Sequence, residues 1–203
     1  LDFLDNQNGD SADTFHVVGS GLAGVEVSLA LRHRWPKRPI KLLARTDRLD
    51  PKLTKALRAA EVHILHQPAG APAACALATS SAGLICSGSR APGWLLASGL
   101  PCCQSSGRVR TTNELQVIDH PTIFASGDCA LIDACPRPPS GVWAVRAAIP
   151  LARNLEAACQ KQPLQQWKPQ PHALQLLGGF RSGHPTAWAL WGSIQIGPHP
   201  LLW

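Results

Sequence analysis

The sequence has neither methionine nor tyrosine, and charged residues make up only 16% of it. So little charge, beside 45% hydrophobic residues, excludes a disordered tail. No apolar run approaches the roughly 18 residues of a membrane-spanning helix, which predicts no transmembrane segment. The chain begins at Leu1 rather than at a methionine, so we expect its natural start to lie upstream.

The seven cysteines contain no C-x-x-C pair and are odd in number. A chain of 203 residues with this apolar content needs no disulfide framework, so we expect free thiols and a cytoplasmic location. The neighbours Cys102 and Cys103 are either a redox pair or small packing residues, and packing is favoured. The spacing of Cys129 and Cys135 does not suit zinc, which predicts no metal site.

Positive charge exceeds negative charge, with a formal net charge of +6. The basic residues are scattered along the chain, so we predict no nucleic-acid partner. The eight histidines are also dispersed, and no G-x-S-x-G elbow or Ser/His/Asp arrangement supports hydrolase chemistry. We therefore predict no catalytic side chain.

Short apolar runs alternate with helical spacing in the first third of the chain. Strands are predicted at 14–18, 40–44 and 62–65. Helices are predicted over 22–34 and, from the start signal Asp50-Pro51, to about residue 60. The order strand-helix-strand-helix-strand indicates an α/β fold with a parallel sheet.

The rest of the chain gives fainter signals. Strands are predicted at 83–86 and 122–125, and a helix over 150–159 that starts at Pro150. Apolar stretches between glycines suggest short strands in the tail, 172–203.

The strongest motif is G-x-G-x-x-G, formed by Gly19, Gly21 and Gly24 between a predicted strand and a predicted helix. Gly19 would permit the tight turn, Gly21 would let a pyrophosphate approach the backbone, and Gly24 would let helix and strand pack closely. The N–H groups at the helix start would then hold the phosphates. This context predicts a dinucleotide-binding site.

The acidic residue that usually grips the adenosine ribose is missing. About 20 residues after the motif the sequence has Ala44 and Arg45. Arg45 either holds a 2′-phosphate, which would favour NADP(H), or is a solvated surface residue. Asp128, which follows Gly127, has two possible roles: it is either a cofactor ligand or the N-cap of a short helix at 129–133.

Four stretches together resemble the pyridine nucleotide-disulfide oxidoreductase superfamily. They are GSGLAGVE, GLICSGSRAPGWL, TIFASGDCA and GVWAVRAAIPLARNL, in the family's order. Among its members the sequence looks closest to type II NADH dehydrogenase-like proteins, and closer still to the flavoprotein half that some bacteria fuse to selenide, water dikinase. The family's first flavin motif and its redox cysteine pair are both absent.

The resemblance implies a Rossmann-like NAD(P)-binding domain at 14–112, after a linker at 1–13. The C-terminal segment of an FAD-binding domain would follow at 113–160, and an incomplete α+β C-terminal domain at 161–203. FAD and NAD(P)H are the implied cofactors. Glu26 matches the family residue near the nicotinamide, and Asp128 matches the ribityl ligand. The implied cofactor-binding residues are Gly19, Ser20, Gly21, Leu22, Gly24, Glu26, Arg45, Ser87, Gly88, Gly127, Asp128, Val142 and Ala144.

The expected function is hydride transfer from NAD(P)H to a flavin, and onward to a small-molecule acceptor such as a quinone. The alternative is a non-catalytic nucleotide-binding fragment, or a regulatory module fused to a selenide, water dikinase-type enzyme. Trp188, Trp191 and Trp203 either pack within the tail domain or touch another subunit or the inner face of a membrane, and packing is favoured.

Overall fold

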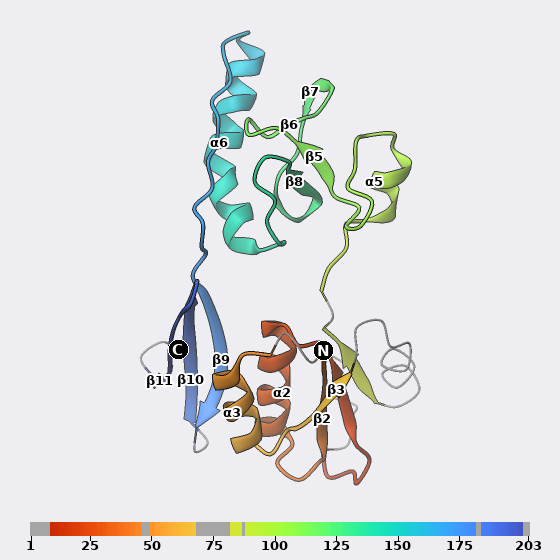
Figure 1. Ribbon diagram of the computed structural model, residues 1–203, viewed down its shortest axis with the longest axis vertical. Coiled ribbons are helices and arrows are strands. Elements are labelled where there is room, and N and C mark those ends of the chain that lie inside the picture. Colours follow the sequence, from red (N-terminus) through yellow and green to blue (C-terminus); the bar gives the residue numbers. More distant parts are fainter. Residues whose placement is uncertain (1–8, 46–48, 68–81, 87, 182–183, 201–203) are drawn as a thin grey trace. The chain divides into compact units, whose positions relative to one another are not determined.

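A computed structural model describes the chain except for residues 1–8, 46–48, 68–81, 87, 182–183 and 201–203 (Figure 1). The chain forms two compact units. The first unit joins Leu1–Gly88 to Leu174–Trp203, and the second is Ser89–Ala173.

A parallel sheet of order β3-β2-β1-β4 forms the centre of the first unit. Its strands are β1 (Phe15–Val18), β2 (Ile40–Arg45), β3 (His63–Gln67) and β4 (Gly83–Ile85). Helix α2 (Leu22–Arg34) follows β1, and helix α3 (Pro51–Ala59) follows β2. The side chain of Asp50 accepts hydrogen bonds from two N–H groups of the first turn of α3. This Rossmann-like order confirms the predicted α/β fold.

The core of this unit lies where α2 and α3 meet the sheet. Alternate strand residues such as Phe15, Val17 and Leu42 are fully buried against Val25 of α2 and Leu57 of α3. The other face of β1 and β2 buries Val18 and Leu43. Burial on both faces explains why apolar residues occupy consecutive positions at Val17–Val18 and Leu42–Ala44 instead of alternating with polar ones.

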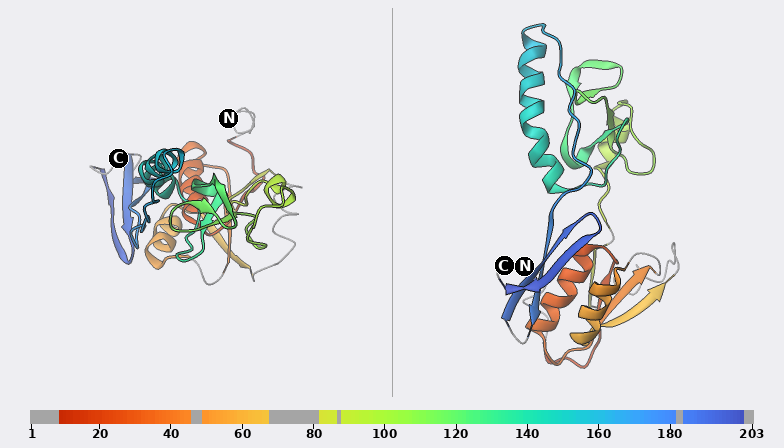
Figure 2. Two further views of the ribbon diagram at one scale, coloured as in Figure 1. Left: turned by 90° about the horizontal axis from the view of Figure 1, so that it is seen from above. Right: turned by 60° about the vertical axis from the view of Figure 1, so that its left-hand side comes forward.

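An antiparallel sheet of order β11-β10-β9 packs against α2 (Figure 2). Its strands are β9 (Gln175–Arg181), β10 (His184–Trp191) and β11 (Ile194–His199), which confirms strands in the tail. Leu177 and Trp188 join the core beside Leu29, and His33 stacks on Phe180 with ring centroids 3.8 Å apart. Helix α2 is therefore covered on two sides by sheets.

The second unit is built on a sheet of order β7-β6-β5-β8. Its elements are α5 (Gly93–Ala97), β5 (Val109–Thr111), β6 (Gln116–Val117), β7 (His120–Phe124), the 3₁₀ turn η1 (Gly127–Cys129), β8 (Ala130–Ile132) and α6 (Gly141–Cys159). Strand β5 pairs antiparallel with β6 and parallel with β8. None of the described helices in either unit could span a membrane.

The predicted helix start at Pro150 is wrong, because Pro150 lies within helix α6. The helix begins nine residues earlier, at Gly141. Tertiary bonds further along hold the helix: the Asn154 amide donates to the carbonyls of Glu114 and Gln165, at 2.7 and 2.9 Å, and accepts from the Gln165 N–H at 2.8 Å. Such bonds offset the backbone hydrogen bond that a proline removes.

The alternative prediction, that Asp128 is the N-cap of a short helix at 129–133, is also wrong. Asp128 lies inside η1, and residues 130–132 form strand β8 rather than a helix, because β8 pairs with β5. A local propensity for a helix cap is overridden here by a sheet contact distant in sequence.

The borders between the units, at 88/89 and 173/174, differ from the predicted domain borders at 112/113 and 160/161. Cys102 forms a β-bridge with Val109, and β5 pairs with β8, which ties residues 89–112 to the segment that follows. The tail strands pack on α2 instead of forming a separate unit. The cofactor assigned to each segment stays a prediction.

Candidate functional site

The loop between β1 and α2 has the geometry that the glycine motif predicts. Gly19 has a φ of 132°, which strains any other residue, and its N–H donates to the Leu43 carbonyl at 3.0 Å. A Cβ on Gly24 would lie 2.0 Å from the Gly19 carbonyl oxygen. The tight turn and the close helix–strand approach are therefore both confirmed.

The N-terminus of α2 is open. Its N-cap is Gly21, so no side chain caps the helix, and a Cβ built on this glycine meets nothing within 4 Å. Gly21 is exposed, and the neighbouring Ser20 and Leu22 are half-buried. Helix N-terminal N–H groups without a side-chain cap, together with the helix dipole, form a site for an anion such as a pyrophosphate.

The remaining predicted residues of this unit gather at the same edge of the sheet. Val18, the last residue of β1, pairs with Leu43 and Ile85, so β1 and β4 end together and β2 continues two residues further, to Arg45. Arg45 is the exposed last residue of β2. Gly88, with a φ of 97°, is exposed just beyond β4. Parallel α/β sheets bind ligands at this edge, where the strand order reverses beside β1. Ser87 lies outside the described residues.

Glu26 lies on the exposed side of α2, two residues after Gly24. Its carboxylate accepts a hydrogen bond from the Gly178 N–H of β9 at 2.8 Å. The same carboxylate that the resemblance assigns to the nicotinamide is thus attached to the antiparallel sheet. Sequence spacing could not reveal this contact, because the two residues lie 152 positions apart.

The predicted flavin residues gather in the second unit. Gly127 has a φ of 70°, and a Cβ there would lie 3.5 Å from the Ala144 Cβ. Ala144 and Val142 are half-buried in the first turn of α6, whose N-cap, Ser140, makes no capping bond through its side chain. Asp128 is exposed in η1. Contact between η1 and α6 thus places an exposed carboxylate near an open helix N-terminus.

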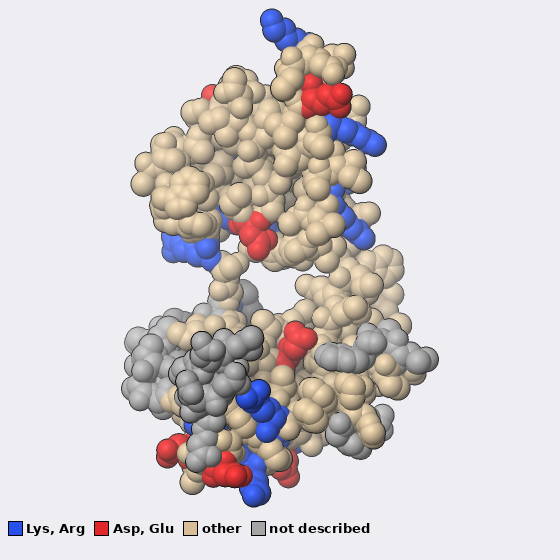
Figure 3. All heavy atoms as spheres, turned by 180° about the vertical axis from the view of Figure 1, so that it is seen from behind, with Lys and Arg blue, Asp and Glu red and all other residues tan. Residues whose placement is uncertain are grey.

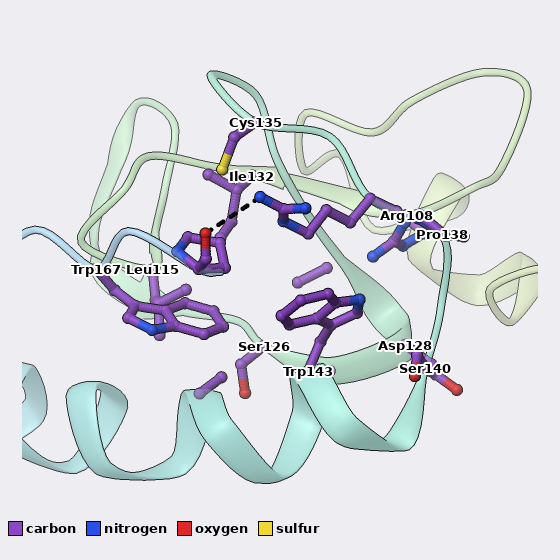
Figure 4. Close-up of a pocket in the computed structure, with 15 residues that line it drawn as sticks. Arg108, Leu115, Ser126, Asp128, Ile132, Cys135, Pro138, Ser140, Trp143 and Trp167 are labelled. Atoms are coloured by element: carbon purple, nitrogen blue, oxygen red, sulfur yellow. Dashed lines mark hydrogen bonds between the residues drawn. The ribbon is translucent and has the colours of Figure 1, made fainter. Parts of the chain in front are cut away.

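A small cavity of about 40 Å³ lies beside these residues and is large enough for water (Figure 4). The indole rings of Trp143 and Trp167 line it together with Arg108 and Asp128. Burial lowers the pKa of Arg108, and the charge of Asp128 opposes that shift.

Arg108 and Arg137 are residues that the sequence does not single out. The Arg108 guanidinium donates to the Arg137 carbonyl at 2.6 Å. The Arg137 side chain lies over the Trp143 ring at 4.9 Å and donates to the carbonyls of Pro169 and Pro171, each at 3.1 Å. An arginine directly after a turn glycine looks like a surface residue, and its burial is visible only in the structure, where its guanidinium bonds the carbonyl of Arg137, 29 positions away.

The described cysteines are all free. Among the described residues no three His, Cys, Asp or Glu side chains are placed to hold a metal ion. Cys102 donates to the Leu95 carbonyl and Cys103 contacts Ser105, so the two neighbouring thiols have different partners.

No family model and no curated protein matches the sequence. Several solved structures are similar to this chain. A FAD-dependent pyridine nucleotide-disulphide oxidoreductase from Desulfovibrio vulgaris aligns with 87% of this chain and 49% of its own, at a TM-score of 0.59 and 16% identity. A NAD-dependent persulfide reductase from A. fulgidus aligns with 92% of this chain and 36% of its own, at a TM-score of 0.58 and 15% identity.

A chain in the structure of the mitochondrial ATP synthase of Tetrahymena thermophila is also similar, at a TM-score of 0.54 and 16% identity. It aligns with 93% of this chain and 52% of its own. The chain thus spans about half or less of the structures that it matches. At this identity the likeness shows the fold, which is a mixed α/β fold of the kind found in FAD- and NAD-linked oxidoreductases.

Proposed function

We propose that this chain is the NAD(P)H-binding part, with a flavin-contacting segment, of an FAD-dependent oxidoreductase. The observation that carries the proposal is the open N-terminus of α2 at the reversal point of a parallel sheet. Gly24 and Gly19 bring helix and strand into contact there, while the space in front of Gly21 is empty of protein atoms. Protein structures that bind dinucleotides use this arrangement for the pyrophosphate.

The residues of the first unit would position the nucleotide. The N–H groups at the start of α2 would bind the pyrophosphate oxygens. The guanidinium of Arg45, exposed at the end of β2, would pair with a 2′-phosphate. Glu26 would lie near the nicotinamide, with its orientation fixed by the hydrogen bond from Gly178.

In the second unit, the exposed carboxylate of Asp128 would accept hydrogen bonds from the ribityl hydroxyls of the flavin. The positive φ of Gly127 and its packing against Ala144 place that carboxylate beside the first turn of α6. The N–H groups of that turn would face the pyrimidine ring of the flavin. NAD(P)H would supply the hydride, and the flavin would accept it and pass electrons to a small-molecule acceptor such as a quinone.

A nucleotide-binding module without flavin chemistry is the second candidate, including a regulatory module fused to a selenide, water dikinase-type enzyme. The sequence favours it in one respect, because it contains a single G-x-G-x-x-G and hence one pyrophosphate loop. The presence of flavin separates the two candidates. Titration of FAD with the chain should perturb the flavin absorbance, even at weak affinity, if the chain is part of an oxidoreductase, and should leave the flavin spectrum unchanged if it is a binding module without flavin chemistry.

Nucleotide titration tests what both candidates share. The chain should bind NADPH or NADH saturably at one site, and ADP-ribose should compete, because the loop binds the pyrophosphate rather than the nicotinamide. Failure to bind any of these three compounds would overturn the nucleotide assignment and both candidates with it.

A further inference from the structure

A groove of about 810 Å³ lies in the first unit, between helices α2 and α3 and the antiparallel sheet. It is separate from the glycine loop, since it adjoins the C-terminal half of α2. Its volume is within the range of about 300–1,000 Å³ that is typical of small-molecule sites.

Helix α3 presents one face to this groove. Lys52, Lys55, Ala56 and Ala59 line it, at the i, i+3, i+4, i+7 spacing of a single helix face. The core-facing residues of the same helix, Leu53 and Leu57, are buried elsewhere in the unit. Two cations therefore border a floor of small apolar side chains.

Helix α2 contributes a third cation in a fixed position. The Arg32 guanidinium donates to the carbonyls of Pro36 and Glu61, at 2.9 and 3.1 Å. These bonds hold the charge at the groove wall without neutralising it, because both acceptors are backbone groups. Lys52 makes a similar contact with the Gln195 carbonyl at 3.4 Å.

The groove is otherwise largely apolar. Ala56 and Ala59 form its floor on α3. Leu29, Trp188 and Pro198 line it opposite α3. Among the described residues that line the groove there is no aspartate or glutamate, so the three positive charges have no carboxylate partner within it. Positive charge of this kind complements an anion, and the floor complements an apolar body.

We propose that this groove binds an amphiphilic carboxylate, with the apolar chain on the alanine floor and the carboxylate between Lys52 and Lys55, while Arg32 lies toward the other end of α3, beside Glu61. An apolar chain would remove the apolar floor from water, which favours binding through the hydrophobic effect. The carboxylate would accept charge-assisted hydrogen bonds from the lysines. This site requires neither flavin nor dinucleotide.

Titration with dodecanoate below its micellar concentration tests the proposal. The double variant Lys52→Gln/Lys55→Gln should weaken dodecanoate binding about tenfold, since it removes two exposed ion pairs, each of which contributes modestly. Dodecanol should bind both proteins alike, because it carries no charge. The matched control Lys161→Gln/Lys168→Gln removes the same net charge from exposed positions in the other unit and should leave the affinity unchanged.

A second variant tests the floor. Ala59 is exposed, so Ala59→Phe should fold normally while filling the groove and abolishing most dodecanoate binding. The same change at the exposed Ala152 of α6 should have no effect. Equal losses in groove and control variants, or dodecanoate binding that survives both groove variants, would contradict the proposal. NADPH affinity serves as the folding control and is expected to stay constant.

Discussion

At the residue scale, the side chain exposed at the end of β2 is expected to decide between NADH and NADPH, and the two candidate residues there are Ala44 and Arg45. Ala44 is fully buried and Arg45 is exposed, although they are neighbours in β2. NAD-preferring sites place a carboxylate at this end of the second strand, where it binds the ribose hydroxyls and repels a 2′-phosphate. Here the side chain available at the strand end is a cation.

NADPH should therefore bind at least as tightly as NADH. Arg45→Ala should weaken NADPH binding about ten- to a hundredfold, because charge-assisted hydrogen bonds contribute about 1.5–3 kcal/mol. Arg45→Glu should shift the preference toward NADH, because the exposed side chain at the end of β2 would then be a carboxylate, whereas the buried Ala44 faces the core. Dissociation constants for both nucleotides provide the test, and an equal effect of Arg45→Ala on the two would show that Arg45 does not read the 2′-phosphate.

Cys103 is a second residue whose chemistry depends on its neighbours. Its thiol lies 3.2 Å from the Ser105 hydroxyl. Hydrogen bonds from Ser105 and Ser106 stabilise the thiolate and lower the pKa of Cys103 to about 6. Since thiolate is the reactive form, the thiol is expected to be mostly reactive at neutral pH.

Alkylation of Cys103 by iodoacetamide should consequently rise through a midpoint near pH 6. Ser105→Ala should move that midpoint upward, toward the ordinary value of about 8.5. Mass spectrometry of the labelled peptide would measure the rate at each pH. Ser193→Ala, in the turn before β11, provides the control, and an identical profile for both variants would refute the role of Ser105.

Side-chain roles were the hardest feature to infer from the sequence. The turn at Gly19 and the packing at Gly24 followed from the motif, because only glycine suits those positions. The burial of Arg108 and the bond between Glu26 and Gly178 could not be inferred, since both depend on contacts between segments distant in the sequence.

At the scale of elements, the joint between β1 and α2 holds the site together. Gly24 lies in α2, where alanine would ordinarily stabilise the helix by up to about 1 kcal/mol. Its Cβ would instead lie 2.0 Å from the Gly19 oxygen, which is backbone and cannot move cheaply. Steric conflict therefore outweighs propensity at this position.

Gly24→Ala should lower the free energy of unfolding by about 1–3 kcal/mol, the usual cost of overpacking. Gly21→Ala makes the same chemical change where nothing lies within 4 Å, so it should cost less, at most about 1 kcal/mol, because alanine is a poorer helix N-cap than glycine. Urea denaturation followed by circular dichroism would compare the two. A Gly24→Ala protein as stable as the Gly21→Ala protein would contradict the close approach.

The predicted elements of residues 14–66 agree with the structure because their signals are local: apolar runs, an Asp-Pro helix start and glycine breaks. Helix α6 was predicted too short, because a proline in mid-sequence resembles a helix start. The bonds of Asn154 that support the longer helix come from segments 11 and 40 residues away.

At the scale of the whole molecule, two features bear on binding: the distribution of charge over the surface, and the share of the similar structures that the chain covers. On the face shown in Figure 3, Lys and Arg side chains stand apart among uncharged surface, with acidic groups between them. The chain spans between 36% and 52% of the structures that it resembles. The sequence contains one G-x-G-x-x-G motif, at Gly19, Gly21 and Gly24.

This chain alone should accordingly bind FAD weakly. Asp128 and the first turn of α6 would contact only the ribityl chain and the ring, which leaves the FAD pyrophosphate without a loop of its own. The ratio of flavin absorbance to protein after gel filtration with added FAD would measure this. Tightly bound FAD at one per chain would show that the flavin site is complete here.

The central claim is that the open start of α2 binds the pyrophosphate of a dinucleotide. Gly21→Val tests it most directly, because the new side chain enters space that is empty of protein and should leave the fold intact. Gly93→Val, at an equally open glycine outside the loop, is the matched control. We expect Gly21→Val to abolish saturable NADPH binding, and we expect Gly93→Val to retain wild-type affinity. An unchanged NADPH dissociation constant in a folded Gly21→Val protein would contradict it.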